Sequence, residues 1–278
     1  MKRFSGEAIG YIKDMFVQHN MVKRSVISAL SILIMGFGIS LFSVSGFGVD
    51  PYTSMNMNIA YATGIRFGTV QLIMNICVLL FVVIVAHRGL VGVGTVFNMV
   101  GCGYVCEFFE GVFTPILAPY YDLLAVRIVV LCCGIVVLCF ACSLFFVANV
   151  GVGPYDALSF MLSGKSHMQH KWARVLTDIT VVTIGLVVSG GLQAALHGNF
   201  GAVQNIGLGT IITAFCMGPL INFFSKHVSS KILDVDYEKI SKDVAFFMIR
   251  GAMLKNSAPA YVEHQREVLP ENVAEKKI

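Results

Sequence analysis

Four polar residues at helical spacing are the clearest candidates for chemistry in this sequence. Arg174 and Asp178 stand four residues apart in an otherwise apolar segment, and Gln71 and Asn75 have the same spacing in another. Residues four apart share one face of a helix, so each segment presents one polar pair. An unpaired charge at mid-bilayer costs at least about 2.5–3.5 kcal/mol. We therefore expect Asp178 either to neutralise Arg174 or to bind a cation, a proton or a polar substrate.

Two glycine-rich stretches that run into Pro-Tyr form the second group of candidates. A proline is favoured at the first position of a helix, a preceding Asp can cap that helix, and a carboxylate in its first turn favours the helix dipole. The sequence therefore predicts short helices over about residues 51–62 and 154–163. They are either re-entrant half-helices that aim at a central cavity or capped surface helices at the two membrane faces. The hinge or gate candidates are Asp50, Pro51, Tyr52, Pro154, Tyr155 and Asp156.

Other kinds of site lack a recognisable set of residues. The sequence contains no His-Glu-x-x-His motif, nucleophile elbow or phosphate loop. All eight cysteines fall in apolar segments, where thiols pack as small hydrophobic groups. The Gly-x-Gly-Thr motifs from Gly92 and Gly207 begin helices without a preceding strand, and we interpret them as close packing by small residues. We expect no enzymatic activity, no metal and no cofactor.

Long apolar segments must carry these residues. Of the 278 residues, 56% are hydrophobic and 13% charged, which excludes an ordinary soluble domain with about a quarter of its residues charged. Six segments approach the length of about 20 residues that crosses a bilayer, and their composition favours helices over barrel strands. The third segment would end near Glu107, which we expect, like Glu110, to be solvated at the outer face. The six segments are 25–49, 67–86, 89–106, 128–155, 175–196 and 198–225.

The basic residues predict the orientation of these segments. Eighteen of the 20 lysines and arginines lie in the N-terminal segment, in the loops after the second and fourth helices, and in the tail. Only Arg66 and Arg127 lie on the opposite side. Cytoplasmic loops collect basic residues, so we expect a multi-pass plasma-membrane protein with both termini in the cytoplasm. Contact with anionic lipid accounts for the net charge of +4 without nucleic acid.

The sequence also repeats itself. Residues 24–56 align with residues 127–159 at 12 of 33 positions, and both stretches contain Gly-Val and Pro-Tyr at the same places. Residues 92–109 align with residues 207–224 through their Gly-x-Gly-Thr motifs and paired phenylalanines. Each copy holds three predicted spanning helices, and an odd number places the copies in opposite orientations. Such inverted repeats are common in secondary transporters.

The glycine signatures resemble those of a known family. They read Gly-Phe-Gly-Ile-Ser-Leu-Phe from Gly36, Gly-Phe-Gly-Val-Asp-Pro-Tyr from Gly46 and Gly-Val-Gly-Thr from Gly92, with Val-Gly-Val-Gly-Pro-Tyr-Asp from Val150. This pattern resembles the YczE/YyaS/YitT group of bacterial integral membrane proteins, on its YczE side. The resemblance covers roughly residues 24–225 and implies a bacterial plasma-membrane protein. It supplies no catalytic or ligand-binding residues.

We therefore predict an all-α polytopic membrane protein, with six transmembrane helices in two inverted three-helix repeats. The expected function is transport of a small molecule or ion by alternating access. The alternative is a non-transporting scaffold or assembly factor that recruits partners through its cytoplasmic segments. Expected partners are the lipid bilayer, a substrate and, in a homo-oligomer, further copies of the chain. The predicted parts are a cytoplasmic amphipathic segment 1–23, a first repeat 24–113, an extracytoplasmic linker 114–126, a second repeat 127–225 and a cytoplasmic tail 226–278 with an amphipathic helix.

Overall fold

The computed structural model describes residues 21–86, 92–166, 170–190 and 205–234, and within these ranges every regular element is a helix. The predicted amphipathic helices of the two terminal segments lie outside the described residues. In chain order the elements are α2 (Met21–Val44), α3 (Pro51–Thr63), α4 (Phe67–Ala86), α5 (Val93–Leu117), the 3-10 turn η2 (Ala118–Tyr120), α6 (Leu124–Ala148), α7 (Pro154–Ser166), α8 (His170–Val188), α10 (Leu208–Phe224), the π-helical η4 (Ser225–Ser229) and α11 (Ser230–Leu233).

Five of the described helices are long and apolar enough to cross a membrane. Large apolar side chains on them remain exposed, including Ile84 at 76% and Phe215 at 73%, as expected of surfaces that face lipid. The protein is therefore a multi-pass membrane protein. The segment predicted over 175–196 corresponds to α8, which carries three charged residues and is not among the five. The five spans are Val22–Val44, Phe67–Val85, Val93–Tyr120, Leu124–Ala148 and Leu208–Leu233.

Two predicted helix ends are wrong. α5 continues to Leu117 instead of ending near residue 106, so Glu107 lies inside the helix. α6 ends at Ala148 instead of continuing to residue 155, because Asn149 and Gly151 adopt positive φ values of 50° and 133°. The prediction treated gaps between charges as helix lengths. Charges do not end a helix when they find partners, and apolar sequence does not continue one through a left-handed turn.

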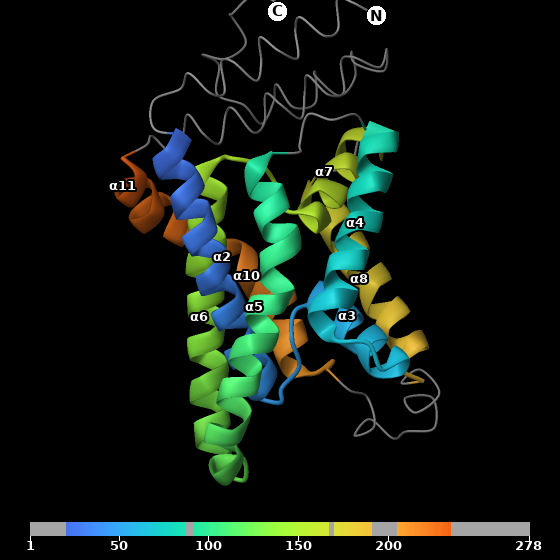
Figure 1. Ribbon diagram of the computed structural model, residues 1–278, viewed down its shortest axis with the longest axis vertical. Helices are drawn as coiled ribbons and strands as arrows, with labels where there is room; N and C mark the ends of the chain where they lie inside the picture. The colour runs from blue at the N-terminus through green and yellow to red at the C-terminus, as the bar shows by residue number, and fades with distance from the viewer. Residues whose placement is uncertain (1–20, 87–91, 167–169, 191–204, 235–278) are drawn as a thin grey trace, which may run out of the picture.

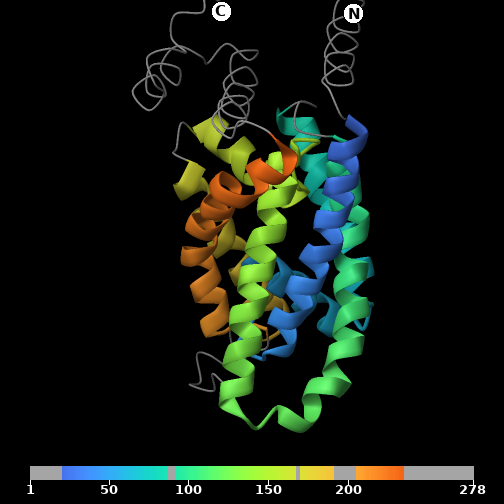
Figure 2. The ribbon, with the colours of Figure 1, turned by 90° about the vertical axis from the view of Figure 1, so that its left-hand side faces the viewer.

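The helices form two groups of four. In the first group, α2 packs against α5 and α6, and α6 packs against α10 (Figures 1 and 2). In the second group, α3 and α7 each pack against both α4 and α8. The tip of the α5–α6 hairpin lies at the end of the molecule opposite the start of α2 (Figure 2).

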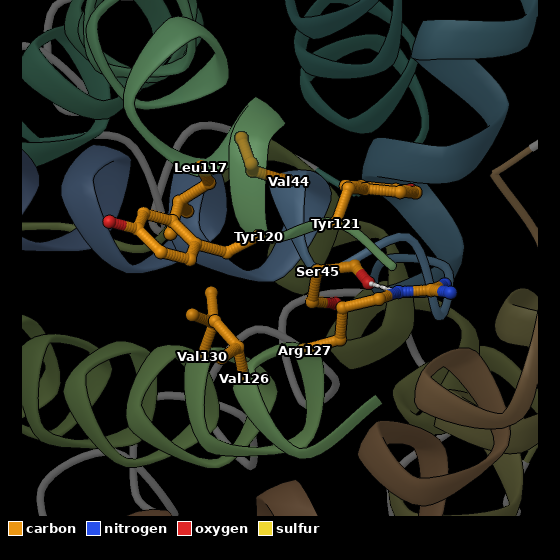
Figure 3. A pocket seen from close by; sticks show the side chains of 8 residues that line it. All are labelled: Val44, Ser45, Leu117, Tyr120, Tyr121, Val126, Arg127 and Val130. Atoms are coloured by element: carbon orange, nitrogen blue, oxygen red, sulfur yellow. Dashed lines mark hydrogen bonds between the residues drawn. The ribbon is translucent and has the colours of Figure 1, made fainter. Parts of the chain in front are cut away.

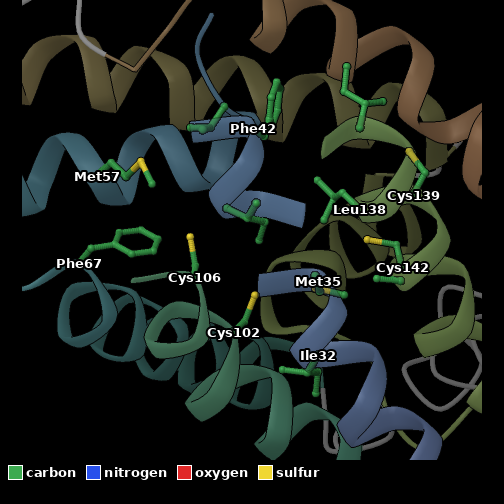
Figure 4. Close-up of a cluster of buried hydrophobic side chains, with 14 of the residues drawn as sticks. Ile32, Met35, Phe42, Met57, Phe67, Cys102, Cys106, Leu138, Cys139 and Cys142 are labelled. Carbon is green, nitrogen blue, oxygen red and sulfur yellow. The ribbon is translucent and has the colours of Figure 1, made fainter. Parts of the chain in front are cut away.

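The largest buried cluster surrounds α2, joins it to α5 and α6, and extends to α3 and α4 through residues such as Met57 and Phe67; Figure 4 shows part of it. It includes Cys102, Cys106, Cys139 and Cys142, which are buried and not bonded to one another. These four thiols pack as small apolar groups, as predicted. The other four cysteines, Cys77, Cys132, Cys133 and Cys216, are exposed on the helices.

The chain between α2 and α3 docks on the start of α10. The Gly209 amide donates to the Phe47 carbonyl over 2.8 Å. Gly48 has a φ of +92°, and a Cβ atom there would lie 2.5 Å from the Gly207 nitrogen. Only glycine permits this combination of backbone angle and close approach. The contact holds the break before α3 in place.

The chain between α6 and α7 docks on the start of α5 in the same way. The Gly94 amide donates to the Val150 carbonyl over 2.9 Å. Thr95 accepts from the Gly92 amide at 3.1 Å and donates to the Val152 carbonyl at 2.8 Å. The Gly-x-Gly-Thr motifs serve close packing, as predicted. What hydrogen-bonds to them is the non-helical chain that links α2 to α3 and α6 to α7.

Replacing Gly151 by alanine should destabilise the protein strongly. The new Cβ would lie 2.6 Å from the Thr95 hydroxyl oxygen and 2.9 Å from the Gly92 Cα, at a φ of +133°. We expect a loss of about 3 kcal/mol or more in unfolding free energy. Gly111→Ala, at an exposed position inside α5, is the control, because nothing lies within 4 Å of its Cβ position. It should leave stability unchanged or raise it by up to about 1 kcal/mol. Equal unfolding transitions in detergent would contradict the docking role.

Candidate functional site

The two short helices point their first turns at each other. Pro51 begins α3, and the Asp50 side chain accepts from the Thr53 amide at 3.1 Å, which confirms the predicted cap. Pro154 begins α7 with Asp156 in its first turn, also as predicted. All residues from 51 to 58 are buried, so the surface-helix alternative is wrong for α3.

The meeting point is a stacked pair of tyrosines. The rings of Tyr52 and Tyr155 have centroids 4.5 Å apart and an interplanar angle of 11°. We call these two residues the tyrosine pair. Each helix has 13 residues and is therefore about 20 Å long, too short to cross a bilayer alone. They are half-helices, with α3 and α7 at different heights along the molecule (Figure 1).

Each hydroxyl of the tyrosine pair donates to a predicted site residue. Tyr52 donates to the Asn75 Oδ1 on α4 over 2.8 Å, and Tyr155 donates to the Asp178 Oδ1 on α8 over 2.5 Å. Both bonds join residues 23 positions apart. The structure therefore places the polar pairs of α4 and α8 on either side of the tyrosine pair. One half offers an amide where the other offers a carboxylate.

Arg174 links the charged groups of this centre. Its guanidinium pairs with Asp156, and its Nε lies 3.5 Å from the Asp178 Oδ1. The guanidinium carbon lies 4.6 Å from the centroid of the Tyr155 ring, within range of a cation–π interaction. The Arg174–Asp178 pair was predicted, whereas the contact with Asp156 was not. One arginine thus serves two carboxylates, and the neutralisation expected from spacing is incomplete.

The first half has buried amides at the matching places. Gln71 is 4% exposed, and no described residue hydrogen-bonds its Oε1. Asn56 is fully buried beside Tyr52, and neither of its amide atoms makes a hydrogen bond of normal geometry with a described residue. Because α3 and α4 form a hairpin, Asn56 and Gln71 lie one turn beyond the Tyr52–Asn75 contact. Buried polar groups in native proteins are rarely left unpaired.

Sequence reasoning missed Asn56 and its neighbour Asn58. Asn58 is also fully buried, and its Oδ1 accepts from the Asn205 side chain at 3.0 Å. The available signal was the alternation of Met and Asn after Ser54 in a helix already predicted to be short. Ser54 is buried too, and its hydroxyl has no partner in the described chain.

The break after α2 is clamped by Arg127 from the first turn of α6. Arg127 donates to the Ser45 carbonyl over 2.9 Å and to the Gly46 carbonyl over 3.2 Å. Its guanidinium also lies 4.7 Å from the Phe47 ring centroid and 4.6 Å from that of Tyr121. Figure 3 shows Arg127 reaching Ser45 beside a cavity of about 10 Å³.

Two acids near this end have partners in the protein. Glu107 accepts from the Arg66 Nε at 2.7 Å and from the Gly68 amide at 3.1 Å. Glu110 accepts from the Ser43 hydroxyl at 2.8 Å. The expectation that these acids are merely solvated is therefore wrong. They join α5 to the ends of α2 and α4.

Two cavities of the described chain lie away from these residues. Besides the small cavity near Arg127, an open groove of about 410 Å³ runs along the apolar outside of α2, α5 and α6. Neither of these two cavities is lined by the tyrosine pair, Arg174 or Asp178. The tyrosine rings and the ion pairs of Arg174 are packed against one another. We call Gln71, Asn75, Arg174 and Asp178, which lie beside the tyrosine pair, the polar centre.

Comparison with known proteins places the chain in a family. Residues 22–226 match the model described as "Family of unknown function (DUF6198)". The chain belongs to this family. It is 28% identical over 211 residues to an "Uncharacterized protein" of Haemophilus influenzae, covering 76% of this chain and 86% of that one. It is 24% identical over 209 residues to the "Uncharacterized membrane protein YczE" of Bacillus subtilis, covering 74% and 87% respectively.

The YczE-like resemblance read from the glycine signatures is thus confirmed. No solved structure matches the chain significantly. The matched region contains both half-helices and all four long helices of the first group.

The two tyrosine hydroxyls should contribute unequally to stability. Tyr155→Phe removes a hydrogen bond to a carboxylate and should cost about 1.5–3 kcal/mol, whereas Tyr52→Phe removes a neutral bond and should cost about 0.5–1.5 kcal/mol. Both variants keep the stacked rings, so each is the other's control. Unfolding of the purified variants in mixed micelles measures the difference. A larger loss for Tyr52→Phe would contradict the assigned partners.

Proposed function

We propose that the protein is a secondary transporter for a small polar solute or ion, working by alternating access between two inverted repeats. The observation that carries this proposal is the meeting of two half-helix N-termini at the tyrosine pair. Helices broken in mid-membrane, with their N-termini at a central site, are typical of transporters with inverted repeats. Irregular backbone at membrane depth is tolerated where protein buries it or where it lines a cavity.

Matched contacts support the inverted repeat. The pairs of equivalent elements are α2 with α6, α3 with α7, α4 with α8, and α5 with α10. The Tyr52–Asn75 bond then corresponds to Tyr155–Asp178, as the aligned sequences require. The docking of one break on α10 likewise corresponds to the docking of the other on α5. On this proposal α8 is the sixth span, and its charges are tolerated because Arg174 faces Asp156 and Asp178.

The polar centre supplies the substrate-binding groups in this proposal. Arg174 and Asp178 provide charge, while Asn75 and Gln71 provide amides. The unpartnered amide of Asn56 adds one donor and one acceptor. The tyrosine pair closes the centre in this conformation, so the two hinges, 50–52 and 154–156, act as gates that must separate. The chemistry is binding and release, without a reaction, metal or cofactor.

The orientation follows the same proposal. In Figure 1 the start of α2, with Lys23 and Arg24, lies at the same end as α11, with Lys231. Arg127 begins α6 at the other end. We place the first end in the cytoplasm of a bacterial plasma membrane, because basic residues collect there. The scaffold alternative rests on the terminal segments, which lie outside the described residues.

A substrate screen combined with a neutralised variant tests the proposal. Purified wild-type protein is screened for solutes that raise its unfolding temperature, and net uptake of each hit into liposomes is then measured. Arg174→Gln alone leaves two carboxylates without their cation and should cost about 3–5 kcal/mol. Adding Asp178→Asn gives α8 the Gln-Asn pair of α4 and should recover part of that loss.

The double variant separates folding from transport. It should fold yet lose at least about tenfold in uptake, since a change of 1.4 kcal/mol already corresponds to tenfold. Arg66→Gln is the matched control, because Arg66 is 75% exposed and pairs with Glu107 instead of with Asp156 or Asp178. It should transport as wild type does. If the folded double variant took up solute at the wild-type rate, the polar centre would not be the site of transport.

A further inference from the structure

The two halves differ at one hydrogen bond in a way that defines a protonation state. Tyr52 donates to the amide oxygen of Asn75, and Tyr155 donates to a carboxylate oxygen of Asp178. A protonated aspartic acid has the shape and neutrality of asparagine and still offers a carbonyl acceptor. Protonation of Asp178 would therefore give α8 the hydrogen-bonding pattern that α4 already has.

We propose that Asp178 binds and releases the coupling proton of the transporter, a proposal that rests on the function proposed above. A hydronium ion in water that reaches the centre transfers its proton to a carboxylate oxygen of Asp178, leaving water. One O–H bond forms at Asp178 and one breaks in hydronium. Release to the opposite side is the reverse step. No electron transfer or other reactant is needed.

The charges around Asp178 leave room for one added positive charge. From the start of α3 it faces Asp50 and Tyr52, from α7 Tyr155 and Asp156, and from its own helix Arg174. Three carboxylates thus share one guanidinium and two helix N-termini, each worth about half a positive charge. About one negative charge remains uncompensated. One bound proton neutralises this remainder.

A proton fits this place better than a metal cation. The Oδ1 of Asp178 already has the Tyr155 hydroxyl at 2.5 Å and the Arg174 Nε at 3.5 Å. The Asp178 side chain is only 13% exposed, and neither described cavity is lined by it. A cation would need several oxygen ligands and space among them. A proton requires neither.

Protonation also has a mechanical consequence. Neutral Asp178 no longer attracts Arg174, whereas Asp156 still does. The ion pair between Arg174 and Asp156 then still holds α8 to the first turn of α7, whereas the ion pair between Arg174 and Asp178 within α8 is lost. The charge state of Asp178 therefore changes how firmly the α7 half of the tyrosine pair is held. That half is the one next to the proposed cytoplasmic side (Figure 1).

Infrared difference spectroscopy of the full-length protein in lipid vesicles tests the proposal directly. Spectra in acidic minus alkaline buffer should contain the carbonyl stretch of a buried carboxylic acid. That band should disappear in Asp178→Asn and move in frequency in Asp178→Glu. In the comparison variants Asp50→Asn and Asp156→Asn the band should persist but develop only at lower pH, because each substitution removes a negative charge that favours protonation of Asp178. The glutamate variant decides the assignment if the asparagine variant does not fold.

Absence of the band from wild type, or its survival in Asp178→Asn, would overturn the proposal. Transport gives the second readout, with a solute identified in the screen above. Asp178→Asn should lose at least about tenfold in uptake driven by a pH gradient, because the neutral state is fixed. Uptake that ignores the pH gradient, without the band, overturns the proton site and leaves the transporter standing. The band without movement of any solute overturns the transporter and leaves the proton site standing.

Discussion

The structure depends on satisfying the backbone at two breaks inside an apolar chain. Lipid offers no hydrogen bonds, so the carbonyls and amides released where α2 and α6 end must find partners in the protein. They find them at the starts of α10 and α5, where Gly209 and Gly94 donate to Phe47 and Val150. These two backbone contacts determine where α3 and α7 begin. They also explain why glycines gather at the breaks and at the helix starts, because two backbones approach there without side chains between them.

Placing two helix N-termini together creates the second constraint. Their dipoles add, and acids are needed close by. Asp50 meets this need as the cap of α3, and Asp156 meets it from the first turn of α7. Asp156 then pairs with Arg174, which in turn holds Asp178 in place. The first half has Gln71 and Asn75 at the matching positions and requires no counter-ion. The two halves of the sequence therefore differ in charge through the residues of α8 and not through the arrangement of their helices.

Local chemistry was readable from the sequence, and non-local chemistry was not. The cap at Asp50, the short helices and the Arg174–Asp178 pair follow from spacings of four residues or fewer. The stack of Tyr52 on Tyr155 joins residues 103 positions apart, and the sequence pattern could align them as equivalents without showing that they touch. The end of α5 was misplaced for the same reason, since Glu107 is paired with a residue 41 positions away. The buried amide of Asn56 stayed hidden because nothing local gives it a partner.

The packing also identifies which parts can move. α3 packs on α8 as well as on α4, and α7 packs on α4 as well as on α8, so each half-helix contacts a long helix from the other half of the sequence. In the proposed transport cycle, neither half of the sequence could therefore move as a rigid unit without separating its half-helix from that long helix. The group α3, α4, α7 and α8 is joined to the group α2, α5, α6 and α10 through the two glycine breaks, with Gly48 and Gly151 at positive φ, and through the packing of α4 on α5. In the proposed transport cycle, one four-helix group would move against the other about these breaks and along the α4–α5 contact, and the tyrosine pair would open only when the half-helices shift within their own group.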